Sequence, residues 1–129
     1  MLTDLEAPLY EIKANLFKGL AHPVRIRVLE ILAESPGQSC AVSALLDGTG
    51  LEASHLSQHL ATLRRHRVVT STRSANTVTY SLAHPGVAEL LRIARAFLVD
   101  TLAESREQLA AAERLPGLQQ GSDRLAVGV

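Results

Sequence analysis

The sequence ASHLSQHLATLRRHRVVTSTRSANTVTYSLAHPGVA runs from Ala53 to Ala88 and contains four arginines but no acidic residue. The whole chain has 13 basic and 13 acidic residues, so the rest of the protein is net acidic and positive charge gathers where this segment folds. Its first half predicts an amphipathic helix from about Ala53 to His66, because Leu56, Leu60 and Leu63 recur at helical spacing. We expect His59 to lie on this inward side as a packed, hydrogen-bonded residue rather than a ligand.

The second half of the segment predicts a β-hairpin. Val68–Thr72 and Thr77–Leu82 are rich in β-branched residues, and the polar turn Arg73–Asn76 separates them. Arg64, Arg65 and Arg67 end the helix, where cations also offset the negative end of the helix dipole. Arg73 at the hairpin tip has no such structural reason and can reach a phosphate or a minor groove.

The outward face of the helix carries small polar side chains, of the kind that read base edges in a major groove. Gln58 offers a donor and an acceptor together, which suits adenine. Such residues are also common on an ordinary solvated helix, and the position between a turn and a basic hairpin favours the nucleic-acid interpretation. The predicted DNA-binding residues are Ser54, His55, Ser57, Gln58, Thr62, Arg65, Arg73 and Asn76.

The preceding segments supply the rest of a helix-turn-helix. Apolar spacing predicts a first helix over about Leu5–Leu20 and a second that opens at Pro23 and ends at Ser35-Pro36-Gly37. A short helix over about Ala41–Leu46 and a turn at Asp47–Gly50 then lead into the segment quoted above. The predicted fold is therefore mainly α: a winged helix-turn-helix with a two-stranded β-hairpin wing and N- and C-terminal dimerisation helices.

A long apolar helix is predicted from Pro85 to about Arg114. We expect one domain over residues 1–114 and a disordered tail over 115–129, which is rich in Gly and polar residues without a period. The first and last helices are too apolar for lone surface helices. Burial in a monomeric core and burial against a second copy of the chain are the two explanations. The predicted dimerisation residues are Leu9, Ile12, Leu90, Ala94, Phe97 and Leu98.

Composition excludes several other classes of protein. Cys40 is the single cysteine, which excludes an internal disulfide and fits a reducing cytoplasm. The N-terminus is too polar for a signal peptide, and no apolar run is long enough to span a bilayer, so we expect a cytoplasmic protein with no membrane partner. We find no paired catalytic carboxylates, nucleophile-base arrangement or phosphate-binding glycine motif, and therefore predict no enzyme activity and no cofactor.

Three segments resemble the ArsR/SmtB family of dimeric winged-helix repressors of bacteria. They are LFKGLAHPVRIRVLEIL at Leu16–Leu32, LEASHLSQHLATLRRHRVV at Leu51–Val69 and TYSLAHPGVAELL at Thr79–Leu91. The resemblance covers about Leu5 to Leu102. It implies a homodimer in which the first and last helices pair across the two-fold axis and each recognition helix enters a major groove of a palindromic operator.

The sequence departs from the family's metal-sensing patterns. Many relatives bind thiophilic metals through a Cys-Val-Cys motif, whose matching positions here are Ala41, Val42 and Ser43, with Cys40 just outside. Others use an Asp-x-His and His-x-x-Glu set, whose matching positions hold His84, Gly86, Phe97 and Asp100. We expect His84 to be a helix N-terminal residue and Asp100 a solvated acid, and we predict no metal site. His22, His84, Asp100 and Glu104 remain an unorthodox alternative.

The sequence thus predicts a dimeric, sequence-specific DNA-binding transcriptional regulator, and specifically a repressor that lacks the usual cysteine metal site. Its predicted partners are double-stranded operator DNA and a second copy of itself, with the effector left open. Two alternatives stay open: a Ni, Zn or Co-responsive repressor with unorthodox N/O ligands, and a winged-helix protein-interaction module without DNA binding.

Overall fold

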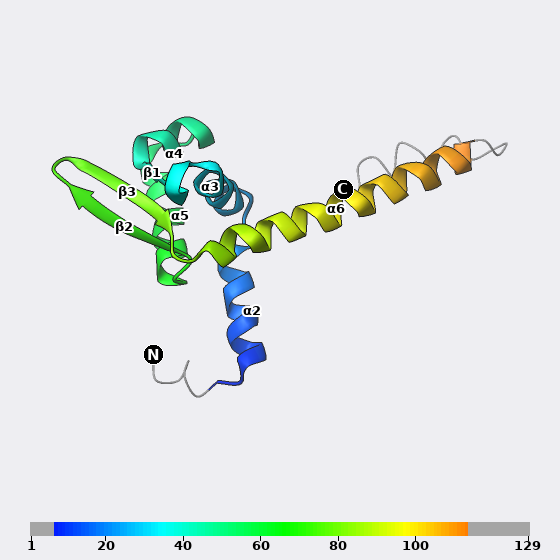
Figure 1. The fold of residues 1–129 in the computed structure, drawn as a ribbon, viewed down its shortest axis with the longest axis horizontal. Coiled ribbons are helices and arrows are strands. Elements are labelled where there is room, and N and C mark those ends of the chain that lie inside the picture. Colours follow the sequence, from blue (N-terminus) through cyan, green and yellow to red (C-terminus); the bar gives the residue numbers. More distant parts are fainter. Residues whose placement is uncertain (1–6, 114–129) are drawn as a thin grey trace. The chain divides into compact units, whose positions relative to one another are not determined.

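The computed structural model describes residues 7–113, which divide between Leu90 and Leu91 into two compact units. The first unit holds α2 to β3 and the first turn of α6, and the second holds the rest of α6 (Figure 1). The expected tail over 115–129 lies outside the described residues. Within residues 7–113, no helix combines the length and the apolar character that a membrane crossing requires.

The first described helix, α2, spans Leu9–Leu20. The prediction began this helix at about Leu5, and it is wrong for Ala7 and Pro8, which are described and are not helical. Pro8 lies just before the helix with an extended backbone (ψ 147°). A proline also disfavours helical geometry in the residue before it, which excludes Ala7. Helix α3, Pro23–Glu34, begins at proline as predicted, and the His22 ring Nδ1 caps it by accepting a hydrogen bond from the Val24 amide at 3.1 Å.

Helix α4 spans Val42–Thr49 and is longer than predicted, because Asp47, Gly48 and Thr49 are helical rather than a turn. Two contacts extend it. A Cβ at Gly48 would lie 2.6 Å from Ile31 Cδ1, so glycine lets α3 pack closely here. The Thr49 hydroxyl donates to the Leu45 carbonyl at 2.7 Å. The helix ends at Gly50, whose left-handed backbone (φ 69°) is one that glycine adopts without strain.

Helix α5, Ala53–Arg65, is the predicted recognition helix, and its three predicted leucines are buried. It ends with the Val68 amide donating to the Leu63 carbonyl at 3.1 Å. Arg67 takes the left-handed conformation (φ 60°) that this termination requires and that glycine fills more easily. The buried apolar side chains of the first unit are Leu20, Val28, Leu29, Leu32, Leu45, Leu56, Leu60, Leu63, Val68, Val69, Tyr80 and Leu82.

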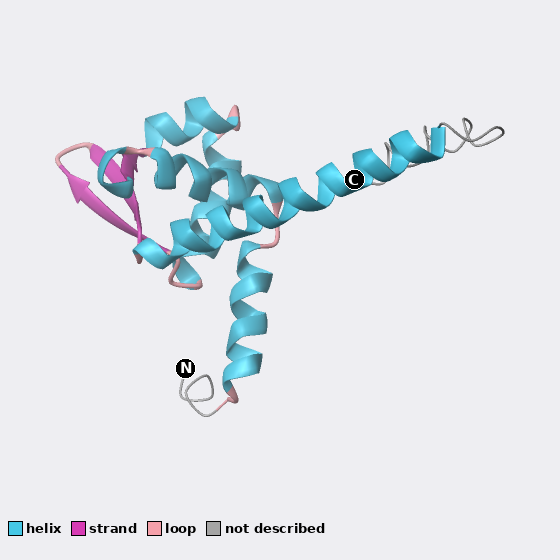
Figure 2. Ribbon diagram, turned by 45° about the vertical axis from the view of Figure 1, so that its right-hand side comes forward, coloured by secondary structure: helices cyan, strands magenta, loops and turns pink. Residues whose placement is uncertain are grey.

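The sheet has three antiparallel strands in the order β1-β3-β2, namely Ser39–Ala41, Thr77–Leu82 and Val69–Ser74 (Figure 2). The predicted two-stranded hairpin is β2 and β3, and both views show it extending beyond the helices of the first unit. The sequence interpretation missed β1, which pairs Cys40 with Tyr80. It also placed Arg73 in the turn, whereas Arg73 belongs to β2 opposite Val78.

Helix α6 spans Pro85–Glu113, as predicted to the last described residue. His84 stands at its start, and its Nδ1 accepts a hydrogen bond from the Gly86 amide at 2.8 Å. Phe97 and Leu98 are more than half exposed, at 67% and 54%. The helix therefore presents large apolar side chains to its surroundings in its middle part, at Ile93, Phe97, Leu98 and Val99.

Candidate nucleic-acid interface

Helix α5 presents the predicted polar residues on its outer face. Ser54, His55, Ser57 and Gln58 are exposed in its first two turns, opposite the buried leucines. No acidic residue lies between Ala53 and Ala88, so the outer face of α5 itself carries no carboxylate, and exposed Glu52 stands just before it at the N-cap. The leading end of the helix is thus free to reach base edges.

Thr62 and Arg65 differ from those residues because they are already engaged with the helix itself. The half-buried Thr62 hydroxyl donates to the Gln58 carbonyl at 3.2 Å and accepts from Arg65 Nη2 at 3.3 Å. These bonds orient the exposed Arg65 guanidinium along the helix. The Thr62 hydroxyl is therefore engaged within the helix, whereas the Arg65 side chain is exposed.

Arg64 links the recognition helix to the wing. Its Nη1 donates to the Ser71 hydroxyl on β2 at 3.3 Å. The sequence interpretation treated Arg64 only as a charge near the helix end. Arg64 and Ser71 are seven residues apart on two different elements, so no helical or strand period identifies them as partners.

The hairpin carries the other predicted contacts. Arg73 is exposed on β2, one pair inside the turn that joins the strands, and Asn76 is exposed in the turn itself. Ala75 beside it has a left-handed backbone (φ 54°). Arg73 is therefore held by strand pairing rather than carried on a turn, which fixes the base of its long side chain.

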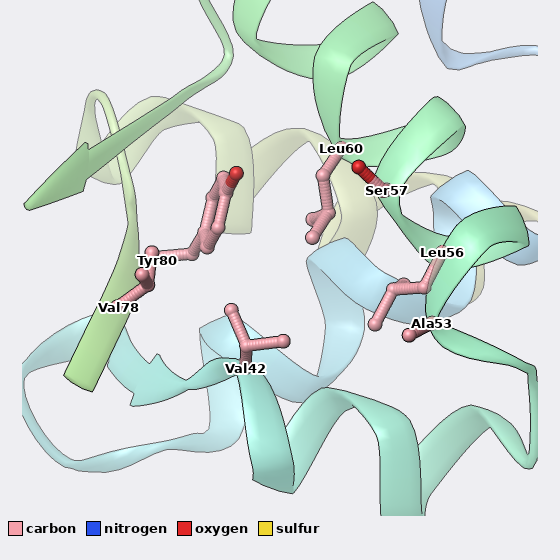
Figure 3. Close-up of a pocket in the computed structure, with 7 residues that line it drawn as sticks. All are labelled: Val42, Ala53, Leu56, Ser57, Leu60, Val78 and Tyr80. Atoms are coloured by element: carbon pink, nitrogen blue, oxygen red, sulfur yellow. The ribbon is translucent and has the colours of Figure 1, made fainter. Parts of the chain in front are cut away.

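A shallow cleft of about 170 Å³ separates the start of α5 from β3 (Figure 3). Figure 3 shows Val42, Leu56 and Leu60 facing it from the helices and Tyr80 facing it from the strand, with the Ser57 hydroxyl nearby. The lining is mostly apolar, and Ser57 is exposed. Helix α5 and strand β3 of the hairpin therefore stand on two sides of one cleft.

His84 and Asp100 are the two potential ligands at the metal-motif positions, and they stand in different surroundings. His84 Nδ1 is occupied by the cap at Gly86. Asp100 is exposed, as expected of a solvated acid. Among residues 7–113, no three His, Cys, Asp or Glu side chains gather closely enough to hold a metal ion, which includes the alternative set with His22 and Glu104.

Cys40 is half-buried on β1. Burial raises the pKa of its thiol, and a hydrogen bond with Ser35 offsets part of that rise. A raised pKa keeps the sulfur in its less reactive thiol form.

The predicted dimerisation residues are mostly uncovered in the single chain. Leu9, Ile12, Ala94, Phe97 and Leu98 are exposed, and Leu90 is half-buried. The structure adds exposed apolar side chains that were not predicted, namely Tyr10, Phe17, Ile93 and Val99. Tyr10 and Phe17 could have been found from their seven-residue spacing, which places them on one side of α2.

Comparison with known proteins identifies relatives of the same architecture. A family model described as a helix-turn-helix domain matches residues 20–72. The HTH-type transcriptional regulator Rv0081 of Mycobacterium tuberculosis is 49% identical over 98 residues, 75% of this chain and 83% of the relative. The crystal structure of Rv0081 matches with a TM-score of 0.69 at 48% identity, over 77% of this chain and 97% of that one.

Two further solved structures are similar. One is the homodimeric winged helix-turn-helix domain Mb0332 of Mycobacterium bovis, a possible ArsR-family regulator, with a TM-score of 0.67 at 26% identity over 74% of this chain and 86% of that one. The other is the transcriptional repressor BigR of Xylella fastidiosa, with a TM-score of 0.62 at 30% identity over 75% and 95%. On these relatives and this geometry, the chain is a DNA-binding transcriptional regulator and belongs to the ArsR/SmtB family of winged helix-turn-helix proteins.

Proposed function

We propose that the protein is a homodimeric repressor that binds a palindromic operator through α5 and the wing. The observation that carries the proposal is the acid-free, polar outer face of α5 beside a hairpin that carries Arg73. In this proposal Ser54, His55, Ser57 and Gln58 contact base edges, while Arg65, Arg73 and Asn76 contact the backbone. Operator DNA as the partner places the working protein in the cytoplasm.

The dimer part of the proposal rests on a different surface. Exposed Leu9 and Ile12 on α2, and Phe97 and Leu98 on α6, are costly to leave in water. The similar Mb0332 domain is homodimeric. A second copy would cover these side chains and would present two recognition helices to two half-sites about 34 Å apart on one face of the duplex.

The test is a salt titration of operator affinity by fluorescence anisotropy, with fragments of the promoters near the protein's own gene and a scrambled duplex as control. We expect one dimer per palindrome and a steep fall in affinity with salt, about 0.9 in log–log slope for each phosphate contacted. An affinity that is equal for palindromic and scrambled duplexes, or that does not respond to salt, would contradict the proposal.

A further inference from the structure

Arg25 on α3 connects the recognition helix α5 to helix α2. It lies in the first turn of α3, and its Nε donates to the Gly19 carbonyl near the end of α2 at 2.7 Å. Its Nη1 lies 3.4 Å from Nδ1 of His59 on α5. One side chain therefore holds the end of a proposed dimerisation helix and the middle of the recognition helix.

The chemistry of these partners fixes the protonation state of His59. A guanidinium has donors and no acceptor, so the His59 Nδ1 must accept and must carry no proton. His22 is constrained in the same way, because the backbone amide of Val24 can only donate to its Nδ1. The two rings lie 4.3 Å apart between centroids, so the junction contains two imidazoles that both need to be neutral.

The surroundings of His59 disfavour its protonated form. Burial lowers the pKa of His59 most, and His22, Arg25 and His55 lower it further because each carries or can gain positive charge. His22 and Arg25 lie at the start of α3, and His55 lies one turn before His59 on α5. From α2, the Gly19 carbonyl accepts a hydrogen bond from Arg25.

His66 is a useful contrast at the other end of α5. Its Nδ1 lies 2.9 Å from the Thr62 carbonyl, which can only accept, so this ring donates and keeps its bond when protonated. Its ring also packs where a Cβ on Gly19 would stand. The same helix thus carries one histidine whose bond survives protonation and one whose bond does not.

We propose that Arg25, His22 and His59 position the recognition helix only while both imidazoles are neutral, so that operator binding weakens as the pH falls below the ordinary histidine range. Protonation would remove two acceptors, and on His59 it would place a new cation beside the Arg25 guanidinium. This inference rests on the proposed operator binding. Arg25 and the two histidines are positioning residues in it, since they hold α5 and do not touch DNA.

The direction of the pH effect follows from the lowered pKa of His59. As the pH falls, the unfolded or released helix takes up a proton at the ordinary pKa, before the docked helix does. The stability that the neutral junction contributes is therefore complete above the ordinary histidine pKa and is lost as the pH falls through the lower pKa of the docked state.

The decisive variant replaces both rings by groups that accept a hydrogen bond but do not titrate. In the full-length His22→Ser/His59→Gln protein, serine can cap α3 and the glutamine carbonyl can accept from Arg25. The two proteins share every other histidine, so the comparison isolates the effect of His22 and His59. His66→Gln serves as the matched single control, because its ring donates.

Operator affinity is measured at pH 7.5 and pH 5.5 at constant ionic strength. We expect the affinity of wild type and of His66→Gln to fall between pH 7.5 and pH 5.5 by a larger factor than the affinity of the double variant, because only the first two proteins keep the His59 ring whose pKa is lowered. Equal pH dependence in wild type and the double variant would overturn the inference. A wild type that binds no operator at pH 7.5 would instead refute the proposed function.

An NMR titration of the imidazole nitrogens in the free wild-type protein tests the junction without DNA and without a variant. We expect the Nδ1 atoms of His22 and His59 to be unprotonated at pH 7.5, the Nδ1 of His66 to be protonated, and His59 to titrate below the ordinary histidine range. A proton on His59 Nδ1 at neutral pH, or a titration at or above the ordinary range, would overturn the inference even if the double variant failed to fold.

Discussion

Helices α2 and α5 have nearly the same length and opposite surfaces. The leucines of α5 are buried within the same chain and its Ser, His and Gln side chains are exposed. In α2, only Gly19 and Leu20 near the end of the helix are buried. Leu9 is 64% exposed on α2, while Leu56 is 1% exposed on α5. Because both helices are amphipathic, the pattern of apolar residues alone does not reveal which face the chain itself covers. The comparison separates a surface suited to DNA from one suited to another protein.

The largest expected effect comes from a substitution in the proposed dimer interface. Leu98→Glu on α6 would bury an unpaired carboxylate in the dimer, at a cost of about 3–5 kcal/mol. We expect folded monomers with poor operator affinity, measured by sedimentation velocity. Ala96→Glu is the control. Residues two positions apart in a helix are separated by about 200° around its axis, so this variant adds the same charge on another face. Wild-type protein that sediments as a folded monomer at micromolar concentration would refute the dimer.

A pair of leucine truncations tests the contrast between α2 and α5 directly. Leu56→Ala should lower the free energy of unfolding by about 2–5 kcal/mol, because it leaves a cavity in the core. Leu9→Ala should change the unfolding of the monomer little but weaken the dimer. Chemical denaturation at several protein concentrations distinguishes these effects. Equal losses that do not depend on concentration would show that α2 packs on its own chain.

Two changes on the DNA-facing side separate base recognition from backbone binding. Gln58→Ala should cost about 1–3 kcal/mol on the cognate operator and relax the preference at one base position. Arg73→Ala should weaken binding to all duplexes and reduce the salt slope by about 1, because one cation no longer neutralises a phosphate. Anisotropy on specific and random DNA measures both. Identical behaviour of the two variants would contradict the division of roles.

The smallest expected effect concerns Cys40, which belongs to neither surface. Because burial raises the pKa of its thiol, the thiolate is scarce at neutral pH and becomes abundant only above the ordinary thiol range. Alkylation by iodoacetamide should therefore be slow at pH 7 and accelerate as the pH rises. Cys40→Ser should leave operator affinity unchanged, apart from a small loss of stability. If that variant instead loses an inducer's effect while it still binds operator, Cys40 is a sensor.

Sequence patterns over a few neighbouring residues were enough to predict part of the fold. Proline at position 23 marks the start of a helix, the spacing of Leu56, Leu60 and Leu63 marks its buried face, and β-branched runs mark the hairpin. The sequence also determined the acid-free outer face of α5, since charge and helical period can be read without a partner.

Other features depend on contacts between residues that are distant in sequence, and these became visible only in the folded structure. The three-residue strand β1 exists because β3 pairs with it, and α4 continues through Gly48 where Ile31 packs against it. Sequence could place His59 on the inner side of α5 but could not supply its partner, because Arg25 is 34 residues away. Helical period and turn residues act over a few positions, whereas pairing, close packing and shared hydrogen bonds arise only once the chain has folded.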